Sequence, residues 1–283
     1  DFIYWKVWQG GMAYASTGFG DQNNLITDRG RIFEPDFQGE PGFRVGVGVN
    51  LAHDGWDLLL QYTGVHSDIE DRVSRDINDE QIQLLWPFAP VNFFSGFHAA
   101  RADWDIHMNV LDVEWGRSYY VSRFSTLRPF FGLKGLRSDQ DYKVRYWSTD
   151  SVETMDAKMD VWGFGIRVGL DTAWCFARNW AFYGDMALSA AWTRFDSKRK
   201  DHVDEAVVLN SRYKQYGMTP ILELQAGLRW EMWFSDDNYH TAIQVGWEEQ
   251  VWWDFNRLID VTSQGPLGNL DFQGLTLRFR FDF

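Results

Sequence analysis

Residues 275–283 end the chain, read LTLRFRFDF, and alternate strictly between apolar and polar side chains. Successive side chains of a β-strand point to opposite faces, so the apolar set lies opposite Arg278, Arg280 and Asp282. In a transmembrane β-barrel the apolar face of each strand contacts lipid, and the polar face lines the lumen. A soluble sheet also alternates, but an aromatic end backed by arginines is typical of the closing strand of an outer-membrane β-barrel.

The composition of the 283-residue chain favours alternating strands over a dense soluble core. It contains 16 Trp, 22 Phe and 11 Tyr, yet 24% of its residues are charged. No run approaches the roughly 18 apolar residues of a transmembrane helix. Because lipid offers no hydrogen bonds to the backbone, only a closed barrel could then span a membrane. We expect one all-β domain over residues 1–283, an antiparallel transmembrane β-barrel.

The formal net charge of −13 argues against a nucleic-acid partner, because phosphates require a basic surface. Many of the acidic residues fall in three segments that we interpret as loops, Asp21–Glu40, Asp68–Asp105 and Asp139–Asp160. Either these acidic side chains are simply hydrated on exposed loops, or they form a vestibule at the barrel mouth that attracts cations.

Two further features bear on the compartment. Cys175 is the single cysteine, so no intrachain disulfide can form, and cysteine usage leaves the compartment undecided. The sequence starts at Asp1, without a methionine or a basic-then-apolar leader. We therefore expect a mature chain from which a signal peptide has been removed.

Ten segments show the alternation and length expected of strands that cross a bilayer. They are Phe2–Ala15, Phe43–Ala52, Gly55–His66, Trp104–Tyr120, Leu127–Leu136, Met159–Ala173, Trp180–Phe195, Tyr213–Phe234, Tyr239–Trp253 and Leu270–Phe283. Counted back from the last segment, both termini fall on the side of the short connections, which requires an even number of strands. Ten fits, and twelve would fit if a long connection contains another hairpin.

The connections between these segments alternate between short and long, as in barrels with tight periplasmic turns and long extracellular loops. The Asp54-Gly55 pair, within the first short connection, is a strong hairpin signal. The short connections are His53–Gly55, Val121–Thr126, Trp174–Asn179 and Ser235–Asn238. The long ones are Thr17–Gly42, Ser67–Asp103, Arg137–Lys158, Asp196–Arg212 and Asp254–Asn269.

The polar face of these strands mixes charged residues with glycine. The residues predicted to line a pore are Arg44, Asp57, Lys134, Arg167, Asp171, Asp185, Glu223, Arg229, Glu231, Glu248, Arg278 and Arg280, and Asp112 and Glu114 share this face. They form either a charged constriction that selects solutes or a ladder of ion pairs that fills the barrel. Eight strands leave an interior filled by side chains and 16–18 leave an aqueous channel, so ten strands permit both.

Inward glycines favour some open volume in the lumen, or room for a loop. They are Gly46, Gly48, Gly132, Gly163, Gly165, Gly169, Gly227 and Gly246.

Tryptophans gather at both ends of the predicted strands, as expected of interfacial aromatic girdles. Near the tight turns lie Trp56, Trp115, Trp174, Trp180, Trp230 and Trp233. Toward the long connections lie Trp104, Trp162, Trp192, Trp247, Trp252 and Trp253.

Three stretches carry a family resemblance: 4-YWKVWQGGMAYA-15, 41-PGFRVGVG-48 and 53-HDGWD-57. Together with the C-terminal strand, they resemble the pore-forming major outer membrane proteins of Legionella and of environmental chlamydiae. The resemblance implies a porin for small solutes, without a cofactor, in outer-membrane lipid and lipopolysaccharide. It also implies insertion by the barrel-assembly machinery, which reads a terminal aromatic such as Phe283. Members in Legionella are often cysteine-rich and cross-linked, and Cys175 alone departs from that pattern. A homo-oligomer is compatible with the resemblance.

The long Ser67–Asp103 connection is too apolar for a solvated loop. Its segment Ile77–Phe88 has a partly helical period, and the segment Val91–Phe94 that follows is also apolar. We expect it to pack against the barrel mouth or to fold inward as a constriction, unless it covers a subunit interface.

Catalytic and metal sites are not predicted. Asp103, Asp105 and His107 are similar in type to the acidic and Asp–His pairs of omptin proteases, but they lie on a single strand with no second acidic pair opposite. Ser189 and His240 both point inward, yet nothing joins them as a phospholipase pair would require. The six histidines are scattered without metal-ligand spacing.

The sequence therefore predicts an outer-membrane porin for passive diffusion of small hydrophilic solutes or ions. The first alternative is a closed barrel, structural or adhesive, that acts through its loops. The second is an omptin-like surface protease.

Overall fold

A computed structural model describes residues 1–17, 30–51, 55–75, 82–86, 97–234, 239–260 and 265–283. In these residues the regular elements are β-strands, and none of the described segments forms a helix long and apolar enough to cross a membrane. The all-β prediction is confirmed.

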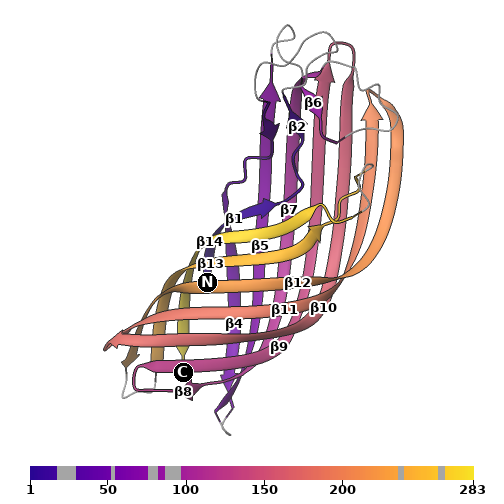
Figure 1. Ribbon diagram of the computed structural model, residues 1–283. Helices are drawn as coiled ribbons and strands as arrows, with labels where there is room; N and C mark the ends of the chain where they lie inside the picture. The colour runs from indigo at the N-terminus through magenta and orange to yellow at the C-terminus, as the bar shows by residue number, and fades with distance from the viewer. Residues whose placement is uncertain (18–29, 52–54, 76–81, 87–96, 235–238, 261–264) are drawn as a thin grey trace.

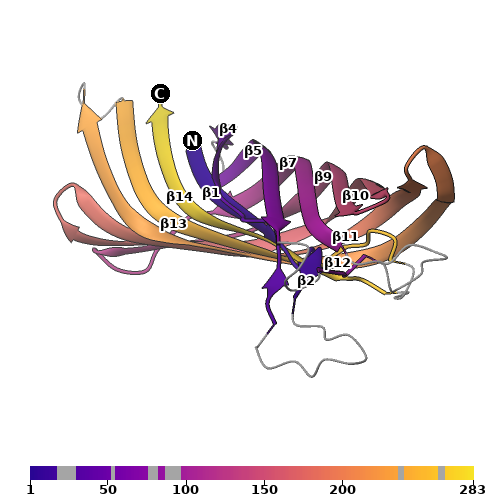
Figure 2. The same cartoon turned by 90° about the horizontal axis from the view of Figure 1, so that it is seen from above.

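Ten antiparallel strands form a closed ring, the predicted number. In ring order they are β1 (Phe2–Gln9), β4 (Gly39–Asn50), β5 (Trp56–Ser74), β7 (Phe97–Arg117), β9 (Ser125–Ser148), β10 (Val152–Ala177), β11 (Trp180–Val203), β12 (Ala206–Phe234), β13 (Tyr239–Asn256) and β14 (Gly268–Asp282). The two-residue strand β8 (Tyr119–Tyr120) pairs with the start of β9. Strands β14 and β1 lie side by side, with both termini at the same end (Figure 2). Among the described residues, each of these ten strands pairs with a neighbour on both sides, which avoids the unpaired backbone that lipid would penalise.

Two of the five predicted long loops are wrong. The Arg137–Lys158 connection is mostly strand, because β9 continues to Ser148 and β10 starts at Val152. The Asp196–Arg212 connection is likewise strand apart from the turn at Asp204 and Glu205. These stretches look loop-like because one face is charged. Their inward face on β9, β10 and β11 is buried and mixes apolar residues such as Tyr142 with polar ones such as Gln140 and Arg199, so the alternation of buried and exposed positions continues beyond the membrane.

The acidic segments interpreted as loops need the same correction. Asp68 and Glu70 lie on β5, Asp103 and Asp105 on β7, and Asp139 on β9. These carboxylates belong to the outward face of long strands. The part of Asp21–Glu40 before residue 30 lies outside the described residues.

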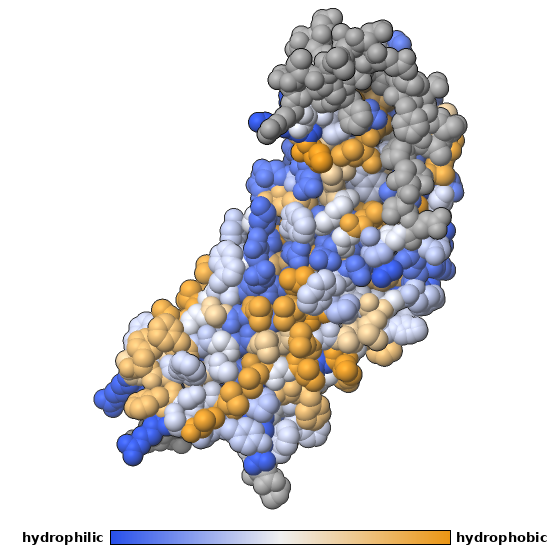
Figure 3. Space-filling model, viewed as in Figure 1, coloured by the Kyte–Doolittle hydropathy of each residue, from blue (hydrophilic) through white to orange (hydrophobic). Residues whose placement is uncertain are grey.

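An apolar band surrounds the half of the barrel that carries the tight turns. Val47 is 68% exposed, Leu133 61% and Phe164 62%, although all three are apolar. Apolar residues dominate the lower part of the face shown in Figure 3, and hydrophilic residues lie above them. A continuous outward band of this kind, backed by a polar lumen, is the lipid-facing surface of a membrane barrel.

Most of the predicted tryptophan girdles point outward, but three members do not. Trp115, Trp162, Trp174, Trp180, Trp192, Trp247 and Trp253 are at least one third exposed and point outward. Trp233 is 57% exposed, but it pairs in register with His240 on the inner face at the periplasmic rim. Trp104 and Trp252 are buried inside the barrel at 0% and 1% exposure. Both residues lie toward the long connections, as predicted. Their positions in the alternation of β7 and β13, however, place their side chains on the inner face.

The extracellular half of the barrel is filled by a small insert. Strands β2 (Ala15–Ser16), β3 (Ile32–Phe33) and β6 (Gln83–Leu84) form a separate sheet, and β2 and β6 lie near the far end of the long strands (Figure 1). We call residues 12–17 together with residues 82–86 the insert.

Inward side chains of β9 hold the insert in place. The hydroxyl of Tyr142 donates to the Met12 carbonyl at 2.7 Å, and that of Tyr146 donates to the Tyr14 carbonyl at 2.6 Å. Within the insert, Trp86 Nε1 donates to the Ala13 carbonyl at 3.0 Å. The inward folding expected of the Ser67–Asp103 connection is thus seen for residues 82–86. Residues 76–81 and 87–96 lie outside the described residues.

Candidate functional site

Charged side chains occupy the lumen at the height of the apolar band. Strand alternation places them there, because the outward positions of the same strands are the exposed apolar residues. All twelve residues predicted from the sequence point to the inner face. Most are largely buried, and Arg280 is an exception at the periplasmic rim.

One charged layer is a two-point ion pair between Arg44 on β4 and Glu248 on β13. The two guanidinium nitrogens lie 3.0 and 2.7 Å from the two carboxylate oxygens. Arg44 Nε also donates to Thr63, and the Thr276 hydroxyl donates to Glu248, each at 3.0 Å. These hydrogen bonds compensate both buried charges, as a buried pair requires.

A second layer gathers around Glu223 on β12. Lys134 Nζ lies 2.9 Å from Glu223 Oε1 and 2.8 Å from Asp112 Oδ1. Arg167 pairs with the same Glu223 oxygen and, at 3.2 Å, with Glu114. Two cations are thus shared among three carboxylates, two from β7 and one from β12.

The third layer is organised by Arg128, a residue that the sequence analysis did not single out. Its guanidinium pairs with Asp57, with Asp171 at 2.7 Å and with Glu114 at 3.3 Å. Arg128 has the same parity on β9 as Lys134, so the alternation could have identified it as inward. It was missed because it lies close to the turn.

Toward the periplasmic end the pairs become more exposed. Arg278 contacts Asp1 at 3.1 Å and Asp185 at 3.9 Å. Asp282 accepts from Arg280 at 2.8 Å and contacts His240 at 2.7 Å. Two further members of the predicted set end the series: Glu231 lies 3.7 Å from His240, and the Arg229 guanidinium lies over the Tyr183 ring.

The charged layers enclose a cavity of about 70 Å³. Its charged lining residues are Arg44, Arg167, Arg278, Glu114, Asp171, Asp185, Glu223 and Glu248. A second cavity of about 10 Å³ lies beside Lys134 and Trp252. A buried polar space of the larger size holds a few water molecules. A hydrated solute passes only if the side chains around it rearrange.

Six of the eight inward glycines, all except Gly46 and Gly48, act differently from the prediction of open volume. For example, a Cβ atom on Gly132 would overlap the Val113 carbonyl, and one on Gly165 would overlap the Ala190 carbonyl. Their absence of a side chain therefore allows close approach of the neighbouring strand.

The candidate catalytic residues are not brought together as a protease or lipase requires. Asp103, Asp105 and His107 lie on the outward face of β7, away from the barrel mouth. Ser189 pairs in register with Ile221, and Ile221 pairs with Trp252 near one end of β13. His240 lies at the other end of β13, close to Asp282.

The terminal residue Phe283 is 97% exposed, and its ring lies 6.2 Å from that of Phe281. Its side chain thus adds little to the packing of the folded barrel.

Comparison with known proteins gives a family for the whole chain. The family model described as Legionella pneumophila major outer membrane protein precursor matches residues 1–283. A search of curated proteins returned no match.

Proposed function

The chain belongs to the Legionella major outer membrane protein family, and on this premise we propose that it is a porin for passive diffusion of small hydrophilic solutes or ions. It is an outer-membrane β-barrel protein. In the proposal, the apolar band contacts lipid and lipopolysaccharide, and the lumen contacts the permeating solute.

The polarity of the lumen is the observation that supports this proposal. Three arginines and five carboxylates line the larger cavity at membrane height. Buried ion pairs contribute little net stability, because the desolvation cost offsets most of the attraction. A barrel that only had to be closed could be filled with apolar side chains. A path for hydrophilic solutes accounts for charges of both signs.

The narrowness of the lumen determines the kind of pore. The larger cavity measures about 70 Å³, and the insert fills the extracellular half. Permeation therefore requires that the insert move or that the ion pairs exchange partners. We expect small, intermittent conductance steps.

Tethering the insert tests this proposal. Ile82 on the insert and Phe97 on β7 face each other in an antiparallel bridge. Such partners have Cα atoms about 4.5–5.5 Å apart, within the range that a disulfide spans. The variant is Ile82→Cys/Phe97→Cys in a Cys175→Ser background, and Ile82→Cys in the same background is the matched control.

Single-channel recording in a planar bilayer gives the readout. The porin proposal predicts conductance steps in the unmodified protein, fewer openings in the oxidised tether, and recovery with a reductant. Equal conductance of oxidised and reduced tether would show that the insert does not gate the pore. A folded, inserted protein that never conducts would refute the porin itself.

A closed barrel with a structural or adhesive role is the second candidate. The packed insert favours it, because Trp86 is 3% exposed and Tyr146 is fully buried within the extracellular half. An insert that stays in place under all conditions would make the barrel a scaffold for its extracellular segments. The absence of conductance in the experiment above would select this candidate.

A further inference from the structure

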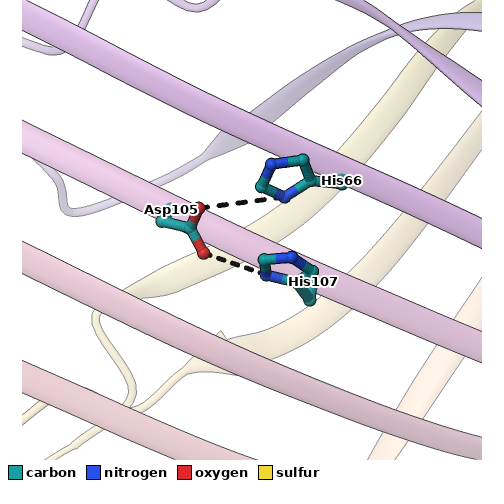
Figure 4. Close-up of side chains that lie close together, drawn as sticks. All are labelled: His66, Asp105 and His107. Atoms are coloured by element: carbon teal, nitrogen blue, oxygen red, sulfur yellow. Dashed lines mark hydrogen bonds and ion pairs between the residues drawn. The ribbon is translucent and has the colours of Figure 1, made fainter.

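Two histidines and an aspartate meet on the outer surface of the barrel. His66 on β5 is directly opposite His107 on β7 in the strand register, and Asp105 lies on the same face of β7. The two imidazole rings stack with centroids 4.0 Å apart (Figure 4). One potential ligand atom from each residue lies within 4.8 Å of the others. The alternation shared by β5 and β7 brings together residues far apart in sequence.

The ring nitrogens that face Asp105 are the candidate metal ligands. His107 Nδ1 lies 3.0 Å from Asp105 Oδ1, and His66 Nδ1 lies 3.8 Å from Asp105 Oδ2. His66 Nδ1 also lies 3.3 Å from the Ile106 carbonyl, a contact that binding of a metal at Nδ1 would replace. An ion between the two Nδ1 atoms and the carboxylate would be bound by all three side chains.

A simple ion pair explains the arrangement less well. If both imidazoles were protonated, two like charges would lie about 4 Å apart in the ring stack. Metal binding requires both rings in the neutral form, which removes this repulsion.

The surroundings of the cluster are acidic. Asp68 is opposite Asp105 in the register, and Asp139 is opposite His107. Arg137 lies 3.5 Å from Asp139 and compensates part of this charge. Neighbouring carboxylates raise the local concentration of cations and offer further oxygen ligands.

The side chains are free to adjust. The two histidine side chains are 52% and 55% exposed, and that of Asp105 is 35% exposed. Small rotations can therefore bring the three ligand atoms to the distances of about 2.0–2.2 Å that Zn²⁺ requires. Three protein ligands leave at least one position for water or an external donor.

We propose that His66, His107 and Asp105 bind one divalent transition-metal ion, such as Zn²⁺ or Cu²⁺, on the outer surface just beyond the apolar band. Imidazole nitrogens select these ions over Mg²⁺ and Ca²⁺, which prefer oxygen-only coordination. The site bridges β5 and β7, and it is independent of the lumen and of any pore activity.

Isothermal titration of the refolded, chelator-treated protein in detergent with Zn²⁺ alone tests the site. We expect one Zn²⁺ per chain, with at least tenfold weaker binding in His66→Gln and in His107→Gln. His202→Gln is the matched control, because it removes an imidazole from β11, and it should bind as the unmodified protein does. Mg²⁺ should give no comparable binding.

Electron paramagnetic resonance with Cu²⁺ provides a second readout. The proposal predicts a signal with two nitrogen ligands, reduced to one in either histidine variant. Failure of the unmodified protein to bind Zn²⁺ would overturn it, as would equal affinity in the His66→Gln variant. Heat-modifiability on gels confirms that each variant is folded, and both histidines are exposed enough for substitution without loss of packing.

Discussion

Arg44 and Glu248 form a two-point ion pair across the lumen although 204 residues separate them in the sequence. Two strands, β14 and β1, lie between β4 and β13 in the ring, so the pair joins parts of the wall that do not contact through the backbone. The pair therefore connects an early strand and a late strand of the closed barrel across the lumen.

Removing one partner of this pair should destabilise the barrel. Arg44→Met leaves Glu248 buried without its cation, and the expected loss is about 3 kcal/mol of unfolding free energy. Arg44→Met/Glu248→Met should lose less than Arg44→Met, because no unpaired charge remains. Urea-induced unfolding in detergent micelles measures both. Arg280→Met serves as the control, since its exposed side chain predicts a change within about 0.5 kcal/mol. Equal losses for single and double variants would contradict the pair's role.

The balance of charge around the larger cavity predicts cation preference, if the lumen conducts as proposed. Five carboxylates face three arginines there. Asp171→Asn/Asp185→Asn should therefore move the reversal potential in a KCl gradient toward anions. Asp139→Asn removes a carboxylate from the outer face of β9 and should change the potential little. A reversal potential unaffected by the lumen variant would show that ions do not pass this cavity.

The terminal Phe283 should matter for assembly and not for the stability of the folded barrel. Its side chain is 97% exposed, so Phe283→Ala should change the unfolding free energy by less than about 0.5 kcal/mol. If the barrel-assembly machinery reads this aromatic, the same variant should reach the outer membrane in several-fold lower amount. Immunoblots of membrane fractions give the readout, and Phe2→Ala is the control for loss of an exposed phenylalanine. Normal levels of the variant would exclude Phe283 as the signal.

Strand parity explains how much of the fold was predictable. In a barrel wall the face of a residue depends only on its position along one strand, so Lys134 and Arg167 could be placed inward from local alternation. Strand ends were harder to locate. Asp139 and Asp141 resemble loop residues, and the buried Tyr142 and Tyr146 that follow them hydrogen-bond to the insert, which local patterns do not reveal.

The sequence could not predict which lumen cation pairs with which carboxylate, for a related reason. Which cation meets which carboxylate depends on the register of all strands between them, as the contact of Arg128 with Asp57 and Asp171 shows. The metal-ligand cluster was missed in the same way. His66 and His107 appear scattered in the sequence, and only the register of β5 and β7 brings them together.

Glu153, near the tip of the β9–β10 hairpin, should make the stability of the extracellular half depend on pH. It is 6% exposed, and one of its carboxylate oxygens has no hydrogen-bond partner in the described structure. Burial raises the pKa of its carboxyl above the usual 4.5, and the carboxylates of Asp201 and Asp204 raise it further.

The sign of the effect follows from proton linkage. The folded protein holds this proton more tightly than the unfolded chain does, so stability falls as pH rises from about 4.5 through the raised pKa. Glu153→Gln removes the ionisation and should stabilise the protein at pH 7 by on the order of 1 kcal/mol. It should also flatten the dependence of urea unfolding on pH between 4 and 7. Glu205→Gln, at the exposed turn between β11 and β12, is the matched control. If Glu153→Gln and Glu205→Gln show the same pH profile, the buried carboxyl is not the titrating group, because burial is the property that distinguishes the two.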